Sequence, residues 1–87
     1  MTNKPNPFNP ATEVCFNMPA KGRLLLEIYD IRGGLVRTLV DAVRPPGPGR
    51  ELWDGADDRG ARVAAGVYIC RAQAQGQVEV SKMVLVR

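Results

Sequence analysis

The chain has no histidine and only two cysteines among its 87 residues. Histidine is the commonest general base and the commonest metal ligand, and two thiolates are too few for a four-cysteine zinc site. Neither Cys15 nor Cys70 has a base of the usual kind beside it that would activate a nucleophile. The composition therefore argues against an enzyme and against a structural metal module, and we expect no catalytic residue and no cofactor.

Long apolar runs are also missing. No run approaches the roughly 18 residues that a membrane-spanning helix needs, so we expect no membrane span. Met1 is not followed by a basic stretch and an apolar core, so any export signal is expected elsewhere in the polypeptide or within the domain itself. Hydrophobic residues are 45% and charged residues 24%, which is typical of one small globular domain.

Basic residues are not gathered into clusters, although the net charge is +3. No basic run is longer than one residue, acidic residues lie between the basic ones, and aromatic residues are only 6%. Nucleic-acid-binding domains usually cluster their basic residues on one face and add aromatic side chains that stack on bases. We therefore expect a solvated surface of mixed charge and no nucleic-acid partner.

Short stretches in which apolar and polar residues alternate predict β-strands at residues 12–18, 23–29 and 66–74. The last run, residues 78–86, is apolar on both faces, which is typical of a central strand or of a strand with a partner. Six or seven short strands separated by turns predict a β-sandwich.

Three segments are less regular. Residues 35–43 fit either a strand or a short helix, and as a strand they would need a bulge or a twist for Val36 and Leu39 to share a face. Residues 44–49 are rich in proline and glycine and are expected to form a loop. Residues 19–22 are expected to form a hairpin turn.

The loop at residues 54–60 is the best metal candidate, because Asp54, Asp57 and Asp58 supply closely spaced carboxylates. It lacks the spacing of a calcium loop, and no glutamate closes it. Aspartates in turns usually accept hydrogen bonds from nearby backbone amides, so we expect a structural role and retain calcium as a weak alternative. The only tryptophan, Trp53, is expected to fill the core rather than to stack on a sugar.

Five motifs occur in order along the chain. They are Asn6-Pro7-Phe8-Asn9-Pro10-Ala11-Thr12, Tyr29-Asp30-Ile31-Arg32-Gly33 with Val36 and Leu39, Trp53-Asp54-Gly55 with Asp58, Gly60 and Val63, Gly66-Val67-Tyr68-Ile69, and Gly76 with Lys82-Met83-Val84-Leu85-Val86-Arg87. Together they resemble the immunoglobulin-like C-terminal module shared by the flagellar hook-capping protein and the type A sorting domains of type IX secretion cargo.

This resemblance implies an all-β fold, an immunoglobulin-like antiparallel β-sandwich of about seven short strands over residues 11–87. Residues 1–10 would be a linker or lead-in rich in proline and asparagine, anchored by Phe8. The chain departs from the family at three positions. Glu51 stands where an apolar residue is usual, Cys70 where a bulky aromatic residue is common, and Ala72 where leucine is common. The last two substitutions predict a lighter core in that region.

The resemblance also implies a function. The chain would be a non-catalytic C-terminal sorting and anchoring module of a larger secreted bacterial protein, recognised by the type IX secretion machinery in the outer membrane. Its other partner would be an upstream cargo domain in the same polypeptide, and its location the cell surface or the exterior, reached through the periplasm. The positions implied for sorting or docking are Gly66, Tyr68, Gly76, Lys82, Met83, Val84, Leu85, Val86 and Arg87.

Two other functions stay open at this point. One is a structural module of the hook-capping type, or another extracellular immunoglobulin-like module. The other is an accessory carbohydrate-binding domain, which would need a cluster of exposed aromatic residues that this sequence barely supplies.

Overall fold

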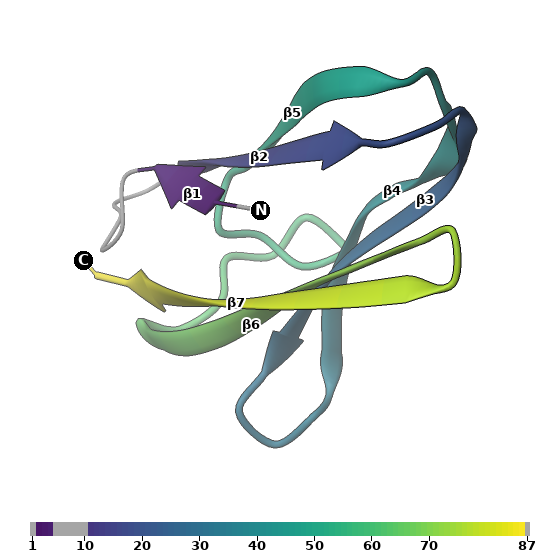
Figure 1. Ribbon diagram of the computed structural model, residues 1–87. Helices are drawn as coiled ribbons and strands as arrows, with labels where there is room; N and C mark the ends of the chain where they lie inside the picture. The colour runs from purple at the N-terminus through teal and green to yellow at the C-terminus, as the bar shows by residue number, and fades with distance from the viewer. Residues whose placement is uncertain (1, 5–10, 87) are drawn as a thin grey trace.

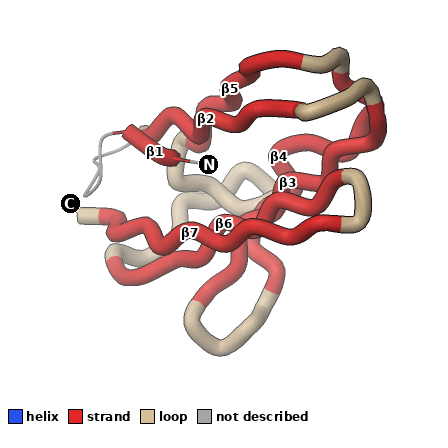
Figure 2. Tube along the Cα trace, in the orientation of Figure 1, coloured by secondary structure: helices blue, strands red, loops and turns tan. Residues whose placement is uncertain are grey.

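The computed structural model describes residues 2–4 and 11–86, which form seven strands (Figure 1). The strands are β1 Thr2–Lys4, β2 Thr12–Met18, β3 Gly22–Asp30, β4 Leu35–Arg44, β5 Gly47–Trp53, β6 Gly66–Ala74 and β7 Gln77–Leu85. The described residues include no helix, and loops and turns connect the strands (Figure 2).

The strands form two antiparallel sheets that pack face to face. One sheet has the order β1-β2-β5 and the other the order β4-β3-β6-β7. Figure 1 shows the three-stranded sheet above the four-stranded one, with the β3–β4 hairpin projecting beyond the sandwich. The prediction of an immunoglobulin-like antiparallel β-sandwich is confirmed.

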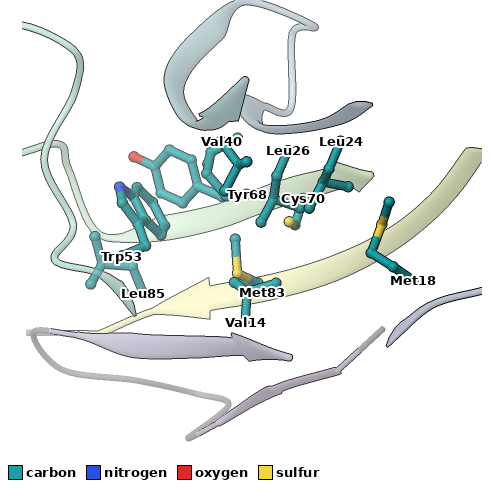
Figure 3. Packing of buried hydrophobic residues seen from close by; sticks show 11 residues of the cluster. Val14, Met18, Leu24, Leu26, Val40, Trp53, Tyr68, Cys70, Met83 and Leu85 are labelled. Carbon is teal, nitrogen blue, oxygen red and sulfur yellow. The ribbon is translucent and has the colours of Figure 1, made fainter. Parts of the chain in front are cut away.

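The core lies between the sheets and follows the predicted alternation. Leu24, Leu26 and Ile28 of β3 are buried, and their neighbours along the strand face outward or are only half-buried. Figure 3 shows Trp53 and Tyr68 at one end of this core and Met18 and Leu24 at the other. The remaining buried members of the cluster are Val14, Val40, Cys70, Met83 and Leu85.

The ambiguous segment 35–43 is a strand, not a helix. Its pairing with β3 shifts register twice, so that Val36 and Leu39 have no direct partner on β3. Each shift is a β-bulge, which inserts one extra residue and turns the following side chains. Both residues thereby pack against the core although they lie three apart, as the strand interpretation required.

Two expected connections are wrong. Residues 19–21 do not close a hairpin, because β2 pairs with β1 and β5 whereas β3 pairs with β4 and β6. They carry the chain from one sheet to the other. Residues 47–49 are not loop either, because they pair with Phe16, Asn17 and Met18 as the first part of β5. Pro48 is tolerated there because β5 is an edge strand, where a missing amide donor costs little.

The two ends of the chain give further differences. Within the expected lead-in, Thr2–Lys4 is strand β1, paired with Glu13, Val14 and Cys15 of β2. Residues 5–10, with Phe8 and most of the first motif, lie outside the described residues. Strand β7 forms one edge of the four-stranded sheet, so the central strand, one of the two alternatives for its apolar run, is excluded, and the alternative of a strand with a partner stays a prediction.

Glu51, which replaces the usual apolar residue, is half-buried and forms an ion pair with Arg44. Arg44 ends β4 and Glu51 belongs to β5, so the pair bridges the two sheets. Leu52, the next residue, points outward and is exposed. The charged pair therefore occupies the margin of the sandwich without disturbing the inward direction of Trp53.

Cys70 is buried in the core, and Cys15 is half-buried on β2; the two cysteines are not joined by a disulfide. Burial raises the pKa of the Cys70 thiol to about 12 from an ordinary value of 9.0, because the core disfavours the charged thiolate. In the unfolded chain this thiol ionises near pH 9, whereas the folded protein keeps it neutral. Above pH 9 the unfolded state therefore binds fewer protons, and stability falls as pH rises.

We expect the free energy of unfolding to fall between pH 9 and pH 12 by up to about 1.4 kcal/mol per pH unit through this group. Urea titrations across that range measure the slope. Cys70→Ala should show a shallower slope by this amount, whatever its stability at neutral pH. Equal slopes in the two proteins would contradict the argument.

Candidate docking surface

The β6–β7 hairpin contains most of the positions implied for docking. Its two glycines of this set, Gly66 and Gly76, adopt backbone conformations that favour glycine. The turn consists of Gln75 and Gly76, whose φ angles are 50° and 73°. Two successive residues with positive φ are typical of the tight turns that suit the right-handed twist of hairpins. Gly66 has a φ of 152° at the start of β6. At both glycines a Cβ would meet no other atom, so conformation rather than space requires glycine.

Gly76→Ala is expected to lower the free energy of unfolding by about 1–2 kcal/mol, the cost of a left-handed conformation for a residue with a Cβ. Thermal and urea unfolding measure this change. Gln77→Ala, at the neighbouring exposed position, is the control and should change stability by less than about 0.5 kcal/mol. A Gly76→Ala protein as stable as the control would show that the glycine is there for another reason.

Three further positions of the implied set belong to the core. The Tyr68 hydroxyl donates a hydrogen bond of 2.6 Å to the backbone oxygen of Ala64. Its ring meets that of Trp53 edge-on, with centroids 5.3 Å apart (Figure 3). Met83 and Leu85 are buried beside this pair. These side chains are not accessible to a partner, so their presence in the motif is explained by folding.

The accessible members of the implied set lie on the other face of β7. Lys82 is exposed and Val84 is half-buried, opposite Ile69 and Val67 of β6. Val86 follows the strand and is exposed. Arg87 lies outside the described residues.

Residues 78 and 80 were not singled out from the sequence, yet they extend this outward face. Val78 is 48% exposed and Val80 is 63% exposed. They lie opposite Gln73 and Arg71 of β6, so they share a face with Lys82 and Val84. We call this surface the outer β6–β7 face, defined by Val67, Ile69, Arg71, Gln73, Val78, Val80, Lys82 and Val84.

The first half of β7 is therefore reversed in polarity. Its valines point to solvent, whereas Gln77, Glu79 and Ser81 are opposite Ala74, Ala72 and Cys70 on the side that faces the other sheet, where Gln77 and Glu79 are still exposed and Ser81 is half-buried. The alternation of polar and apolar residues over 77–81 predicts a strand with one polar and one apolar face. Only the pairing with β6 shows which of the two faces points inward.

A polar group of side chains continues the outer face onto β3. The Tyr29 hydroxyl donates to Glu27 Oε1 at 2.8 Å, and Arg71 Nη1 lies 3.8 Å from the same oxygen. The hydrogen bond to Glu27 raises the pKa of Tyr29, because ionisation would place a phenolate beside a carboxylate. The outer surface thus combines exposed valines with a tyrosine and an arginine, residue types that are enriched at protein interfaces.

The aspartate loop does not gather its carboxylates. Asp54 Oδ1 accepts from the amide of Ala56, Asp57 Oδ1 from those of Arg59 and Ala61, and Asp58 Oδ1 from that of Thr38. Arg37 also lies 3.3 Å from Asp54. Within residues 2–4 and 11–86, no group of three or more acidic, cysteine or histidine residues is placed to hold a metal ion. The carboxylates shape the loop and fasten it to β4.

Trp53 has no accessible face. Its side chain is fully buried, and its indole N–H donates to the backbone oxygen of Ala56 at 2.8 Å. The prediction that it fills the core is confirmed, and it cannot be a platform for a sugar.

A profile of the FlgD Ig-like domain matches residues 9–78. The chain belongs to this family. Comparison with curated protein sequences finds no match.

Solved structures share the fold. FlgD from Xanthomonas campestris, a hook-capping protein essential for flagellar assembly, is 26% identical with a TM-score of 0.68, over 91% of this chain and 58% of that one. Dimeric latent PorU from Porphyromonas gingivalis is 24% identical with a TM-score of 0.76, over 98% of this chain and 9% of that one. PorZ, a surface component of the type-IX secretion system of the same organism, is 17% identical with a TM-score of 0.68, over 99% and 11%. The chain spans less than two thirds of each of these proteins.

None of the residues that the structure describes belongs to a helix able to cross a membrane.

Proposed function

We propose that this chain is a non-catalytic module of a larger bacterial protein and that the type IX secretion machinery recognises it as a sorting and anchoring signal. The observation that carries the proposal is the outer β6–β7 face. Val78 and Val80 expose apolar surface and take no part in the core of this small domain. Lys82 lies on the same face of β7. Exposed apolar patches with polar neighbours are typical of protein interaction sites.

The fold likeness to PorU and PorZ supports this proposal in one respect. In both proteins the matching part is about a tenth of the chain, so this fold occurs there as one module of a much longer polypeptide. The same arrangement here would attach the module to a cargo domain and bring that cargo to the cell surface.

The test fuses the 87-residue chain to the C-terminus of a periplasmic reporter in a bacterium with a type IX system. We expect the reporter at the cell surface, measured by protease accessibility of intact cells. A strain that lacks the secretion machinery is the control and should retain the reporter inside the outer membrane. Retention in both strains would contradict the sorting function.

The outer face is tested in the same assay. Val78→Thr with Val80→Thr keeps the β-branched shape and removes exposed apolar surface, so the melting temperature should change little while surface display falls. Leu52→Thr, an equally exposed apolar position on β5, is the matched control and should leave display unchanged. If the double valine variant reaches the cell surface as well as the Leu52→Thr control does, the outer β6–β7 face is excluded as the recognised surface.

A structural role of the hook-capping type is the second candidate, and the family match and the 26% identity to the Xanthomonas protein favour it. Replacing the Ig-like domain of that FlgD with this chain tests the role directly. Restored hooks and motility, together with failure of surface display, would make this the function.

A further inference from the structure

Strand β4 forms the second edge of the four-stranded sheet. Among the residues that the structure describes, it pairs with β3 and with no strand on its other side. Part of this edge is nevertheless covered. The backbone amide of Asp58 donates to the backbone oxygen of Val36 at 3.0 Å, and Asp58 Oδ1 accepts from the Thr38 amide at 3.0 Å. Asp58 belongs to the aspartate loop, so a loop rather than a strand closes β4 here.

The two contacts of Asp58 have the pattern of a parallel β-bridge. In a parallel ladder a residue donates its amide to the residue before its partner and accepts from the amide of the residue after it. Asp58 does this on either side of Arg37, except that a side-chain oxygen replaces its backbone carbonyl. The edge at Val36 and Thr38 therefore presents the acceptor and the donor that an added strand would use.

This edge also favours one charge. Arg37 lies between the two contacted residues, and its side chain is 29% exposed. Its Nη1 lies 3.3 Å from Asp54 Oδ1 and 3.3 Å from the backbone oxygen of Ala56, and its Nε lies 4.0 Å from Asp58 Oδ1. All three oxygens belong to the aspartate loop, and two of them are carboxylate oxygens. A half-buried guanidinium needs such acidic neighbours, because burial of an unpaired charge is costly.

A residue of another polypeptide could make the same contacts in the place of Asp58. Its amide would donate to Val36, and its own backbone carbonyl would accept from Thr38. Residues that form a bridge in a sheet share a face, so its side chain would lie on the same face as Arg37. An acidic side chain would pair with the guanidinium there, whereas a lysine would place two like charges opposite each other.

We propose that the edge of β4 at residues 36–38 is a docking site for an extended acidic segment of a partner protein, and that Asp58 covers this site in the free protein. The segment displaces Asp58 and pairs in parallel with β4. Backbone hydrogen bonds supply affinity in such strand addition, and the acidic side chain beside Arg37 supplies specificity. The inference does not depend on which machinery recognises the outer β6–β7 face.

The probe is a capped peptide, Thr-Val-Asp-Val-Thr, titrated into the 87-residue protein and its variants and followed by NMR. Asp58→Ala removes the carboxylate that competes for the Thr38 amide. It should therefore bind the peptide about tenfold more tightly than the unchanged protein, with chemical-shift changes at residues 36–38. Asp58→Asn is the matched control, because its side-chain oxygen still accepts from Thr38, and its affinity should stay within about twofold of the unchanged protein.

A second peptide and a second substitution locate the site. The peptide Thr-Val-Lys-Val-Thr should bind Asp58→Ala about tenfold more weakly than the acidic one, because its lysine would lie beside Arg37. Thr38→Pro, added to Asp58→Ala, removes the amide donor on the outer side of an edge strand, where proline is tolerated. Binding of the acidic peptide should then fall about tenfold.

Asp58→Pro opens the edge further. The Gly60 amide donates to the backbone oxygen of Asp57 at 3.0 Å, so Asp58 is the second residue of a four-residue turn, a position that proline favours. Proline there removes both contacts with β4 and keeps the turn. This protein should also bind the acidic peptide about tenfold more tightly than the unchanged protein, and it replaces Asp58→Ala if that variant does not fold. Circular dichroism checks the folding of each variant.

Four results would overturn the proposal. These are no saturable binding to the opened variants, equal binding of the two peptides, shifts confined to the outer β6–β7 face, and unchanged affinity after Thr38→Pro. Sedimentation of Asp58→Ala without peptide gives a further outcome. Self-association of that variant would identify a second copy of the chain, and not an acidic partner, as the occupant of the edge.

Discussion

Trp53→Ala is expected to lower the free energy of unfolding by about 3–5 kcal/mol, the usual cost of removing a large buried aromatic residue. Trp53 is fully buried at the end of β5, and its ring packs edge-on against Tyr68. Its indole N–H also holds the backbone of Ala56 in the aspartate loop. The substitution therefore leaves a cavity between the sheets and removes one of the two hydrogen bonds that the Ala56 carbonyl accepts, the other being from Arg37. A domain of this size has only several kcal/mol of stability, so most of it would be lost.

Urea titration followed by circular dichroism measures this loss. Leu52→Ala is the matched control on the same strand, because Leu52 is 63% exposed and should cost less than about 0.5 kcal/mol. A loss below about 1 kcal/mol for Trp53→Ala would show that the indole does not fill the core.

Removal of residues 82–87 is expected to abolish both folding and surface display. Met83 and Leu85 of this segment are buried, and the segment supplies the β7 side of the pairing with Gly66–Ile69. Its loss removes core volume and a row of backbone hydrogen bonds together. Circular dichroism should show an unfolded chain, and a reporter fused to it should not reach the surface.

The double variant Lys82→Ala with Arg87→Ala separates folding from recognition. Lys82 is exposed, and exposed substitutions usually cost within about half a kcal/mol. If the charges are part of the proposed sorting signal, the melting curve should stay nearly unchanged while the reporter accumulates inside the outer membrane. Normal display of the stable double variant would rule out these two charges. Loss of display in proportion to loss of stability would instead assign them to folding.

Strand positions and the core were predictable because they depend on local alternation. Leu24, Leu26 and Ile28 alternate with polar or half-exposed neighbours, and a strand turns successive side chains to opposite faces. The bulges at Val36 and Leu39 were also foreseeable, since no regular strand brings residues three apart to one face. The burial of Trp53 followed from its being a single large apolar side chain in a small domain.

The docking positions were predicted less well, because motif membership does not distinguish core from surface. Met83 and Leu85 share a motif with Lys82 and Val84, but in the pairing of β6 with β7 they point inward, as Tyr68 of the preceding motif does, whereas Lys82 and Val84 point outward. Val78 and Val80 were overlooked because apolar residues in a strand are expected to face the core.

The sequence by itself determined the all-β class, most strand positions and the inward face of strands such as β3, since these depend on residues close together in the chain. Only the tertiary structure decided which strands share a sheet. That partition made residues 19–21 a crossover, drew residues 47–49 into β5 and placed β7 at an edge. It also decided a groove of about 350 Å³ between the two sheets, because its walls come from strands far apart in the chain, with Phe16 on β2 and Ala74 on β6.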